Sequence, residues 1–202
     1  MKFTSDIDID MANRDHVLGI IKHTSAAIRE KDGQPRKHNT GVYVTDIPYD
    51  AGNRMSSLDY GTAEDRGYVK LDLLNVGVYN EIKSETHLIE MMAEPKWELL
   101  EDQSFVEKII HINKHYDTIH RMPEPINSIP RMAMMLAVIR PGKRHLIGKP
   151  WREVAQEIWE VSDEGYVFKK AHAIAYSHLV VVNMNLLAAS MASSEQELST
   201  DA

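Results

Sequence analysis

The sequence contains no cysteine among its 202 residues. Disulfide bonds and thiolate metal sites are therefore excluded, as is common for proteins of a reducing compartment. A secretory signal is also missing, because residues 1–11 turn acidic at once and contain no apolar core segment. The most apolar stretch, residues 178–190, is interrupted by Asn183 and Asn185 and is too short and polar to span a bilayer. We therefore expect a soluble, cytoplasmic protein without a membrane anchor.

Positive charge is also scarce. The 23 Lys and Arg residues are outnumbered by 30 Asp and Glu residues, which gives a net charge of -7 at pH 7. This balance disfavours a protein that coats nucleic acid, because such proteins usually have a basic surface. It remains compatible with acidic residues gathered around metal ions, and with a local basic patch that faces a phosphate backbone.

The pattern of apolar residues changes along the chain. Alternating or β-branched stretches predict strands at residues 3–11, 41–47 and 68–74, and Asn13 is positioned to cap a following helix. From about residue 76 the pattern becomes helical, with predicted helices at residues 78–92, 103–119, 128–139, 150–162 and 168–190. We predict an α+β fold in which a small sheet (residues 1–76) precedes a mostly helical region (77–192) and a disordered tail (193–202).

Three acids alternate with isoleucines in Asp6-Ile7-Asp8-Ile9-Asp10. Within a strand, this spacing puts all three carboxylates on one face, with neighbours about 6–7 Å apart. Like charges at this spacing are costly unless a divalent cation binds between them, and Mg²⁺ prefers such oxygen ligands. The alternative is an edge strand that turns its acids toward solvent to prevent aggregation.

A second acid lies in an otherwise apolar strand. Asp72 is flanked by leucines, and Lys70 shares its face. An acid in such a strand should be exposed, paired or bound to metal; the simplest alternative is a Lys70–Asp72 surface pair. Taken together, the two strands are typical of phosphoryl-transfer sites, in which carboxylates from neighbouring strands bind two metal ions and a lysine offsets phosphate charge.

These segments resemble the palm of the C-family DNA polymerases, the catalytic alpha subunits of bacterial DNA polymerase III. The strand at residues 6–10, followed by Asn-Arg-Asp-His-Val at 13–17, resembles the family's Pro-Asp-Phe-Asp-Val-Asp-Phe strand and the start of its next helix. Residues 37–42 (Lys-His-Asn-Thr-Gly-Val) resemble Lys-His-Ala-Gly-Gly-Val, and residues 67–74 (Gly-Tyr-Val-Lys-Leu-Asp-Leu-Leu) resemble Gly-Leu-Val-Lys-Phe-Asp-Phe-Leu.

Two later segments are similar to motifs of the family's fingers. Residues 137–142 (Ala-Val-Ile-Arg-Pro-Gly) resemble Ala-Leu-Tyr/Phe-Arg-Pro-Gly, and residues 165–176 resemble Gly-Tyr-Gly-Phe-Asn-Lys-Ser-His-x-x-x-Tyr. The five segments occur in the family's order. The resemblance implies a palm-like sheet of the nucleotidyltransferase type followed by a fingers-like helical region, with DNA-templated DNA synthesis as the activity.

The resemblance also implies roles for individual residues. Asp8, Asp10 and Asp72 would bind two Mg²⁺ ions, or Mn²⁺, and Lys70 would assist electrostatically. A primer–template and dNTPs would be the ligands. The expected contacts to nucleotide or DNA come from Lys37, His38, Arg140, Lys143, Arg144, Lys170 and His172.

The chain also departs from the family pattern. It is several times shorter than an alpha subunit, and it lacks the Gly-Ser strand that holds the triphosphate in the family's palm. We therefore expect either that a second polypeptide supplies this strand, as in a split polymerase, or that the chain is a non-catalytic relative that binds or modulates a replicase. Such a reduction suggests a phage or mobile element, and hence the cytoplasm of a host. A metal-dependent hydrolase is a third possibility, but no residue suggests itself as a water activator.

Other signals have simpler explanations. His111 and His115 would lie one turn apart on the predicted helix, and we interpret them, with His120, as a polar face rather than a zinc site. Lys143, Arg144, His145 and Lys149 form a basic run after Arg140, which is either a solvated loop or a contact surface for phosphate.

Overall fold

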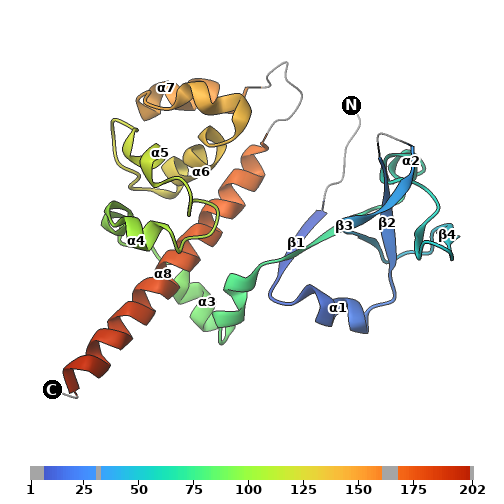
Figure 1. The fold of residues 1–202 in the computed structure, drawn as a ribbon, viewed down its shortest axis with the longest axis horizontal. Coiled ribbons are helices and arrows are strands. Elements are labelled where there is room, and N and C mark those ends of the chain that lie inside the picture. The colour runs from blue at the N-terminus through green and yellow to red at the C-terminus, as the bar shows by residue number, and fades with distance from the viewer. Residues whose placement is uncertain (1–6, 31–32, 161–167, 201–202) are drawn as a thin grey trace. The chain divides into compact units, whose positions relative to one another are not determined.

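The structure, a computed structural model, describes residues 7–30, 33–160 and 168–200, without the side chains of residues 195–200. Asp6 and residues 165–167 of the second fingers-like motif therefore lie outside the described part. The chain forms two compact units, residues 1–81 and 82–202 (Figure 1). The sequence placed this boundary at residue 76.

The first unit is built on a mixed four-stranded sheet with the order β1-β6-β3-β2. β1 (Ile7–Met11) pairs in parallel with β6 (Leu71–Asn75), whereas β3 (Pro35–Tyr43) is antiparallel to both β6 and β2 (Thr24–Arg29). The predicted α+β class with a small sheet is thereby confirmed, and the sheet is mixed. β4 (Tyr49–Asp50) and β5 (Met55–Ser56) form a separate two-stranded ribbon.

Two short helices in this unit begin at side-chain caps. Asn13 accepts a hydrogen bond from the His16 amide at the start of α1 (Arg14–Ile20), which confirms the predicted cap. Asp59 caps α2 (Tyr60–Asp65) by accepting hydrogen bonds from the amide and hydroxyl of Thr62. The 3₁₀ helix η1 (Gly77–Glu81) ends the unit.

A bulge interrupts the pairing of β2 with β3. Ala27 pairs with Lys37 and Ser25 pairs with Val42, so two steps along β2 correspond to five along β3. The three additional residues of β3 break the simple alternation of its side chains. The strand predicted from sequence began only at residue 41, but the structure continues it through this bulge from Pro35.

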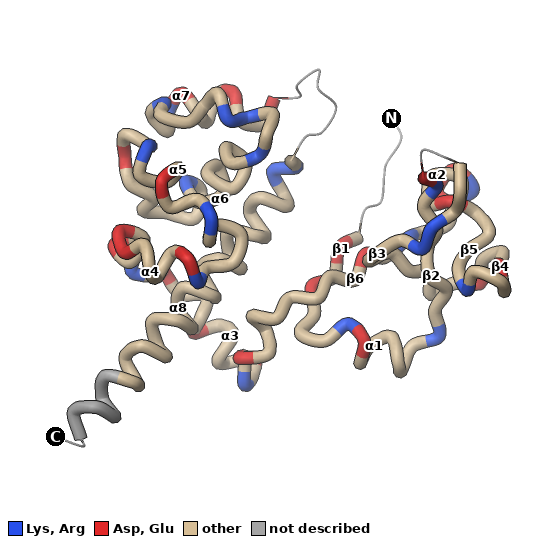
Figure 2. Tube along the Cα trace, in the orientation of Figure 1, with Lys and Arg blue, Asp and Glu red and all other residues tan. Residues whose placement is uncertain are grey.

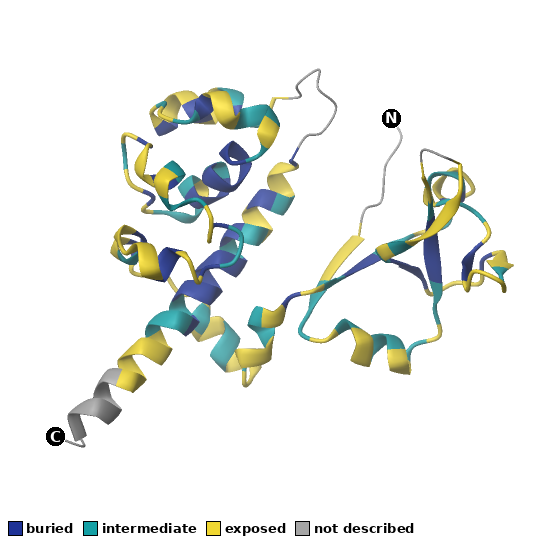
Figure 3. Cartoon of the chain, viewed as in Figure 1, coloured by how far each residue is buried: buried dark blue, intermediate teal, exposed yellow. Residues whose placement is uncertain are grey.

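The second unit is helical. Its elements are α3 (Glu85–Met91), η2 (Trp97–Glu101), α4 (Gln103–Val106), α5 (Tyr116–His120), α6 (Ile129–Val138), η3 (Pro141–Leu146), α7 (Trp151–Glu157) and α8 (Lys170–Thr200). α6 packs against α8, and both are buried where they meet (Figure 3). Met132, Leu136, Val180 and Met184 are among the fully buried residues of this core.

Two predictions for the second unit differ from the structure. The predicted helix at residues 103–119 is divided into α4 and α5, and His111 between them has a left-handed backbone with φ of 67°. His111 and His115 therefore do not share a helix face. At the other end, α8 continues to Thr200, through most of the segment predicted to be a disordered tail.

α8 is long and apolar enough to cross a membrane, judged by length and composition alone. Its residues 170–194 have a most apolar window with a mean hydropathy of 1.4, and Figure 2 shows no charged residue along most of the helix. However, 44% of that window is buried inside the protein, partly against α6. The apolar face of α8 therefore already has a packing partner within this chain.

Tyr43 provides a test of the packing in the first unit. Its side chain is fully buried, and its hydroxyl has no hydrogen-bond partner among the described residues. Burial, together with the negative charges of Asp59, Asp72 and Glu64, raises the pKa of Tyr43 to about 12. Because an unsatisfied buried hydroxyl is unfavourable, we expect Tyr43→Phe to leave the free energy of unfolding unchanged or to raise it by up to ~2 kcal/mol.

Urea denaturation followed by circular dichroism would measure this change. Tyr68→Phe is the matched control, because Tyr68 contacts Tyr43 edge to face at 6.3 Å but is only half-buried. A clear loss of stability in Tyr43→Phe alone would show that the hydroxyl does have a partner.

Candidate functional site

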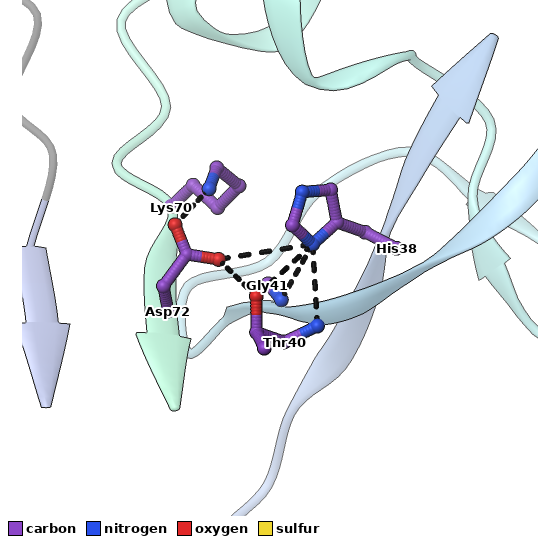
Figure 4. A network of polar contacts seen from close by, with 5 residues as sticks. All are labelled: His38, Thr40, Gly41, Lys70 and Asp72. Carbon is purple, nitrogen blue, oxygen red and sulfur yellow. Dashed lines mark hydrogen bonds and ion pairs between the residues drawn. The ribbon is translucent and has the colours of Figure 1, made fainter. Parts of the chain in front are cut away.

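Asp72 lies at the centre of a buried polar network in the first unit (Figure 4). Only 7% of the residue is exposed. One carboxylate oxygen accepts a hydrogen bond of 2.7 Å from the Thr40 hydroxyl, and the other forms an ion pair with the Lys70 ammonium. A buried carboxylate is tolerated only when its charge and lone pairs are matched in this way. The Lys70–Asp72 pair is therefore a buried pair rather than the surface pair considered from sequence.

His38 is fixed beside Asp72 by the bulge in β3. Its Nδ1 accepts hydrogen bonds from the backbone amides of Gly41 (2.9 Å) and Thr40 (3.3 Å). A nitrogen that accepts these bonds carries no proton, so the neutral ring is protonated on Nε2. The 3.7 Å approach of Nδ1 to the Asp72 carboxylate is consequently not an ion pair in this arrangement.

Gly41 allows the network to close. It pairs with Asp72 across the sheet. A β-carbon at this position would lie 2.8 Å from Cδ of Lys70 and 3.0 Å from Nδ1 of His38, closer than side chains tolerate. Because residue 41 has no side chain, the aliphatic part of Lys70 can pass close to its backbone and the ammonium can reach Asp72.

The register of β1 on β6 places Asp8 directly beside Asp72. Paired residues of neighbouring strands project to the same face, and Asp10, two residues further along β1, shares that face with Asp8. Asp8 is exposed and Asp10 is half-buried. Burial, followed by the negative charge of Asp8, raises the pKa of Asp10.

A divalent cation suits part of this face. The raised pKa of Asp10 indicates that a nearby positive charge would stabilise its carboxylate, and carboxylates are the ligands that Mg²⁺ prefers. In the part of the chain that the structure describes, however, no three acidic or histidine side chains converge as a metal site would require. Asp72 would have to exchange Lys70 for a metal ion before it could join Asp8 and Asp10.

Two neighbours of Asp72 were not identified from the sequence. Thr40 is the first: its hydroxyl reaches Asp72 only through the bulge in β3, which the sequence did not predict. Tyr60, at the start of α2, is the second: its ring contacts His38 edge to face at 5.8 Å, and the Lys70 ammonium lies 5.8 Å from its centre. No strand or helix was predicted between residues 47 and 68, so the sequence gave no reason to bring Tyr60 to this site.

The other expected ligand-binding residues are dispersed. Lys37 is exposed on β3, where its backbone pairs with Ala27. In the second unit, Lys143 donates to the backbone carbonyl of Glu157, and Lys170 lies over the Trp159 ring.

Arg140 stacks on Phe168, His172 contacts Tyr176, and Arg144 is exposed. Of the basic run that follows Arg140, Lys143, His145 and Lys149 all converge on Glu157. Lys143 contacts the backbone carbonyl of Glu157, whereas His145 and Lys149 form ion pairs with its carboxylate. Within the described residues, Arg144 of the run and the preceding Arg140 have no ion pair and no contact with Glu157.

Comparison with known proteins found no matching protein-family model, curated protein or solved structure.

The close approach at Gly41 generates a first test. We expect Gly41→Ala to lower the free energy of unfolding by about 1–3 kcal/mol, because the new methyl group displaces Lys70 or His38. Gly19→Ala is the matched control, since Gly19 lies in α1 with no atom within 4 Å of an added β-carbon. There the substitution should stabilise the helix by up to ~1 kcal/mol. Chemical denaturation of both variants measures the difference, and equal effects would argue against the crowding at Gly41.

The ion pair generates a second test. Lys70→Met should cost about 3–5 kcal/mol, because it leaves the buried Asp72 carboxylate without its counter-charge. Adding Asp72→Asn should restore much of this loss, since the amide is neutral and can still accept from Thr40.

Thermal and chemical denaturation of the two single variants and the double variant would measure the coupling. The matched control is Lys22→Met, which breaks an ion pair whose side chains are 89% and 92% exposed and should leave the midpoint nearly unchanged. Additive losses from the two single substitutions would mean that Lys70 and Asp72 are not coupled.

Proposed function

We propose that this chain is a nucleotidyltransferase subunit related to the alpha subunit of bacterial DNA polymerase III, and that it forms part of a split polymerase. The observation that carries the proposal is the pairing of Asp8 with Asp72 on neighbouring parallel strands, with Asp10 on the same face. This arrangement is the one expected for carboxylates from two strands that share divalent cations.

In this proposal Asp8, Asp10 and Asp72 hold two Mg²⁺ ions, or Mn²⁺. When bound, the ions would activate the primer 3′-hydroxyl and stabilise the charge of the leaving pyrophosphate. Asp8 is exposed and Asp10 is half-buried, so both can be reached from solvent. Asp72 must first release the Lys70 ammonium, which then becomes available to a phosphate oxygen of the incoming dNTP.

Residues around Asp72 would hold the site in shape during this exchange. Thr40 keeps one carboxylate oxygen fixed through its 2.7 Å hydrogen bond. His38 is locked by two backbone amides and, as the neutral Nε2–H form, can donate a hydrogen bond to a phosphate or base. Tyr60 packs on both His38 and Lys70 and limits how far either can move.

The outer edge of β1 supports the partner chain in the proposal. Among the described residues β1 pairs with β6 alone, so its other edge has unpaired backbone groups. Its isoleucines Ile7 and Ile9 are 40% and 39% exposed. An open edge with exposed apolar side chains accepts a further strand readily, and we propose that the Gly-Ser strand of a second polypeptide adds here.

One observation favours the alternative function. Both oxygens of Asp72 already have partners within the chain, and a buried neutralised acid is also what a non-catalytic relative would have. Under that alternative, the protein binds or modulates a replicase, and its acids maintain the fold rather than bind metal.

Primer extension distinguishes the two functions. Wild-type protein, with and without a polypeptide that supplies the Gly-Ser strand, is incubated with primer–template, dNTPs and Mg²⁺ or Mn²⁺. We expect Asp8→Ala and Asp72→Asn to reduce extension by a factor on the order of 10² or more, since each removes charge that stabilises the reacting phosphate. Asp46→Ala is the control, because Asp46 is an exposed acid that pairs with Lys22 rather than with a residue of the proposed site.

Metal binding provides an independent measurement. Electron paramagnetic resonance of Mn²⁺ should detect binding by the wild type and weaker binding by Asp8→Asn, with circular dichroism to verify that the variants fold. Equal extension and equal Mn²⁺ binding in wild type, Asp8 and Asp72 variants would overturn the catalytic proposal and leave the replicase-binding alternative.

A further inference from the structure

Basic side chains gather in the second unit without acidic partners. Arg140 follows α6, Arg144 lies in η3, and His111 and His115 lie in the segment between α4 and α5. Burial, and then the charge of Arg140, lowers the pKa of His111; burial, followed by Arg144 and Arg140, lowers that of His115. Both rings therefore lie in a positive field, and none of the four side chains forms an ion pair with a described carboxylate.

Two nitrogens of this cluster are buried without a hydrogen-bond partner among the described residues: Nε of Arg140 and Nε2 of His111. Most buried nitrogen atoms in proteins are satisfied, so such exceptions require an explanation. The Arg140 nitrogen is the more demanding of the two, because a guanidinium is always charged and its Nε is always a donor.

A row of stacked rings fixes the two groups. The Arg140 guanidinium lies 4.6 Å from the centre of the Phe168 ring, and Phe168 stacks on Tyr176 at 6.0 Å. Tyr176 in turn lies 4.7 Å from the His111 ring. Stacking holds the plane of a guanidinium but leaves the hydrogen atoms at its edge able to donate.

The backbone at His111 is strained. Its φ of 67° is in the left-handed region, which non-glycine residues seldom adopt. Strained residues of this kind are common where a side chain is held toward a ligand.

We propose that Arg140 and His111 form a binding site for a phosphate group. Arg140 Nε and His111 Nε2 would donate to phosphate oxygens, since a phosphate supplies both the negative charge and the acceptors that these groups lack. His115 is half-exposed and Arg144 is exposed, and the charge of Arg144 adds to the positive field at His115. The site follows from these contacts alone, and it rests on the proposed function only in the expectation that the phosphate belongs to a nucleotide or to DNA.

Inorganic phosphate is a suitable probe. We expect the Arg140 Nε–Hε signal in a ¹H–¹⁵N NMR spectrum to shift with saturation as phosphate is added, and to remain in place when chloride is added at equal ionic strength. The signal is assigned by its loss in Arg140→Lys. An Arg140 signal that does not respond, or that responds equally to chloride, would overturn the proposal.

Substitutions then test the individual groups. His111→Asn should weaken phosphate binding about tenfold, the scale of one lost charge-assisted hydrogen bond, while asparagine still tolerates the left-handed backbone. Arg152→Gln is the control for Arg140→Gln, because Arg152 is an exposed arginine on α7. Equal affinity in wild type, His111→Asn and Arg140→Gln would also contradict the site, provided that circular dichroism shows each variant folded.

The source of the phosphate is tested with two further ligands. Stronger binding of dATP than of inorganic phosphate would support a nucleotide site, whereas stronger binding of an oligonucleotide without terminal phosphates would support a site for the DNA backbone. These measurements need no polymerase activity. A phosphate site could thus be overturned while primer extension succeeds, or supported while extension fails.

Discussion

The first unit depends on the burial of the Asp72 carboxylate. An acid that is 93% removed from solvent, the complement of its 7% exposure, would be strongly destabilising without a counter-charge and hydrogen bonds. Three features meet this requirement together: the Lys70 ammonium, the Thr40 hydroxyl and the missing side chain at Gly41. Thr40 and Gly41 are neighbours in β3, and regular alternation would turn them to opposite faces of the sheet. The bulge in β3 breaks this alternation and so brings both residues, with His38, to the Asp72 carboxylate.

In the proposed function, Lys70 and a divalent ion would compete for the Asp72 carboxylate. Lys70 neutralises Asp72 from within the chain. On the adjoining strand, burial, followed by the negative charge of Asp8, raises the pKa of Asp10. A divalent ion would be bound most tightly by all three carboxylates, those of Asp8, Asp10 and Asp72. To reach Asp72 it would first have to displace the buried Lys70 ammonium. Buried ion pairs are costly to break when one partner is left alone. The exchange is therefore favourable only if Lys70 obtains another anion at the same time, which an incoming phosphate would provide.

Sequence reasoning was most successful where the signal was local. The alternation of Ile7, Asp8 and Ile9 predicted the strand, and Asn13 predicted the start of the next helix, because both patterns depend only on side-chain period and capping. The Asp8–Asp72 register also agrees with carboxylates gathered from two strands, although the metal role remains a proposal.

The features that sequence reasoning missed depend on tertiary structure. β2 (Thr24–Arg29) is rich in small residues and lacks alternation of polar and apolar residues, so no strand was predicted for it. In the structure, Ala26 and Ala27 of this strand are buried. The bulge in β3 has no sequence signal beyond Gly41, because it arises from the pairing with β2. In the second unit, continuous helical periodicity concealed the left-handed residue His111, which divides the predicted helix.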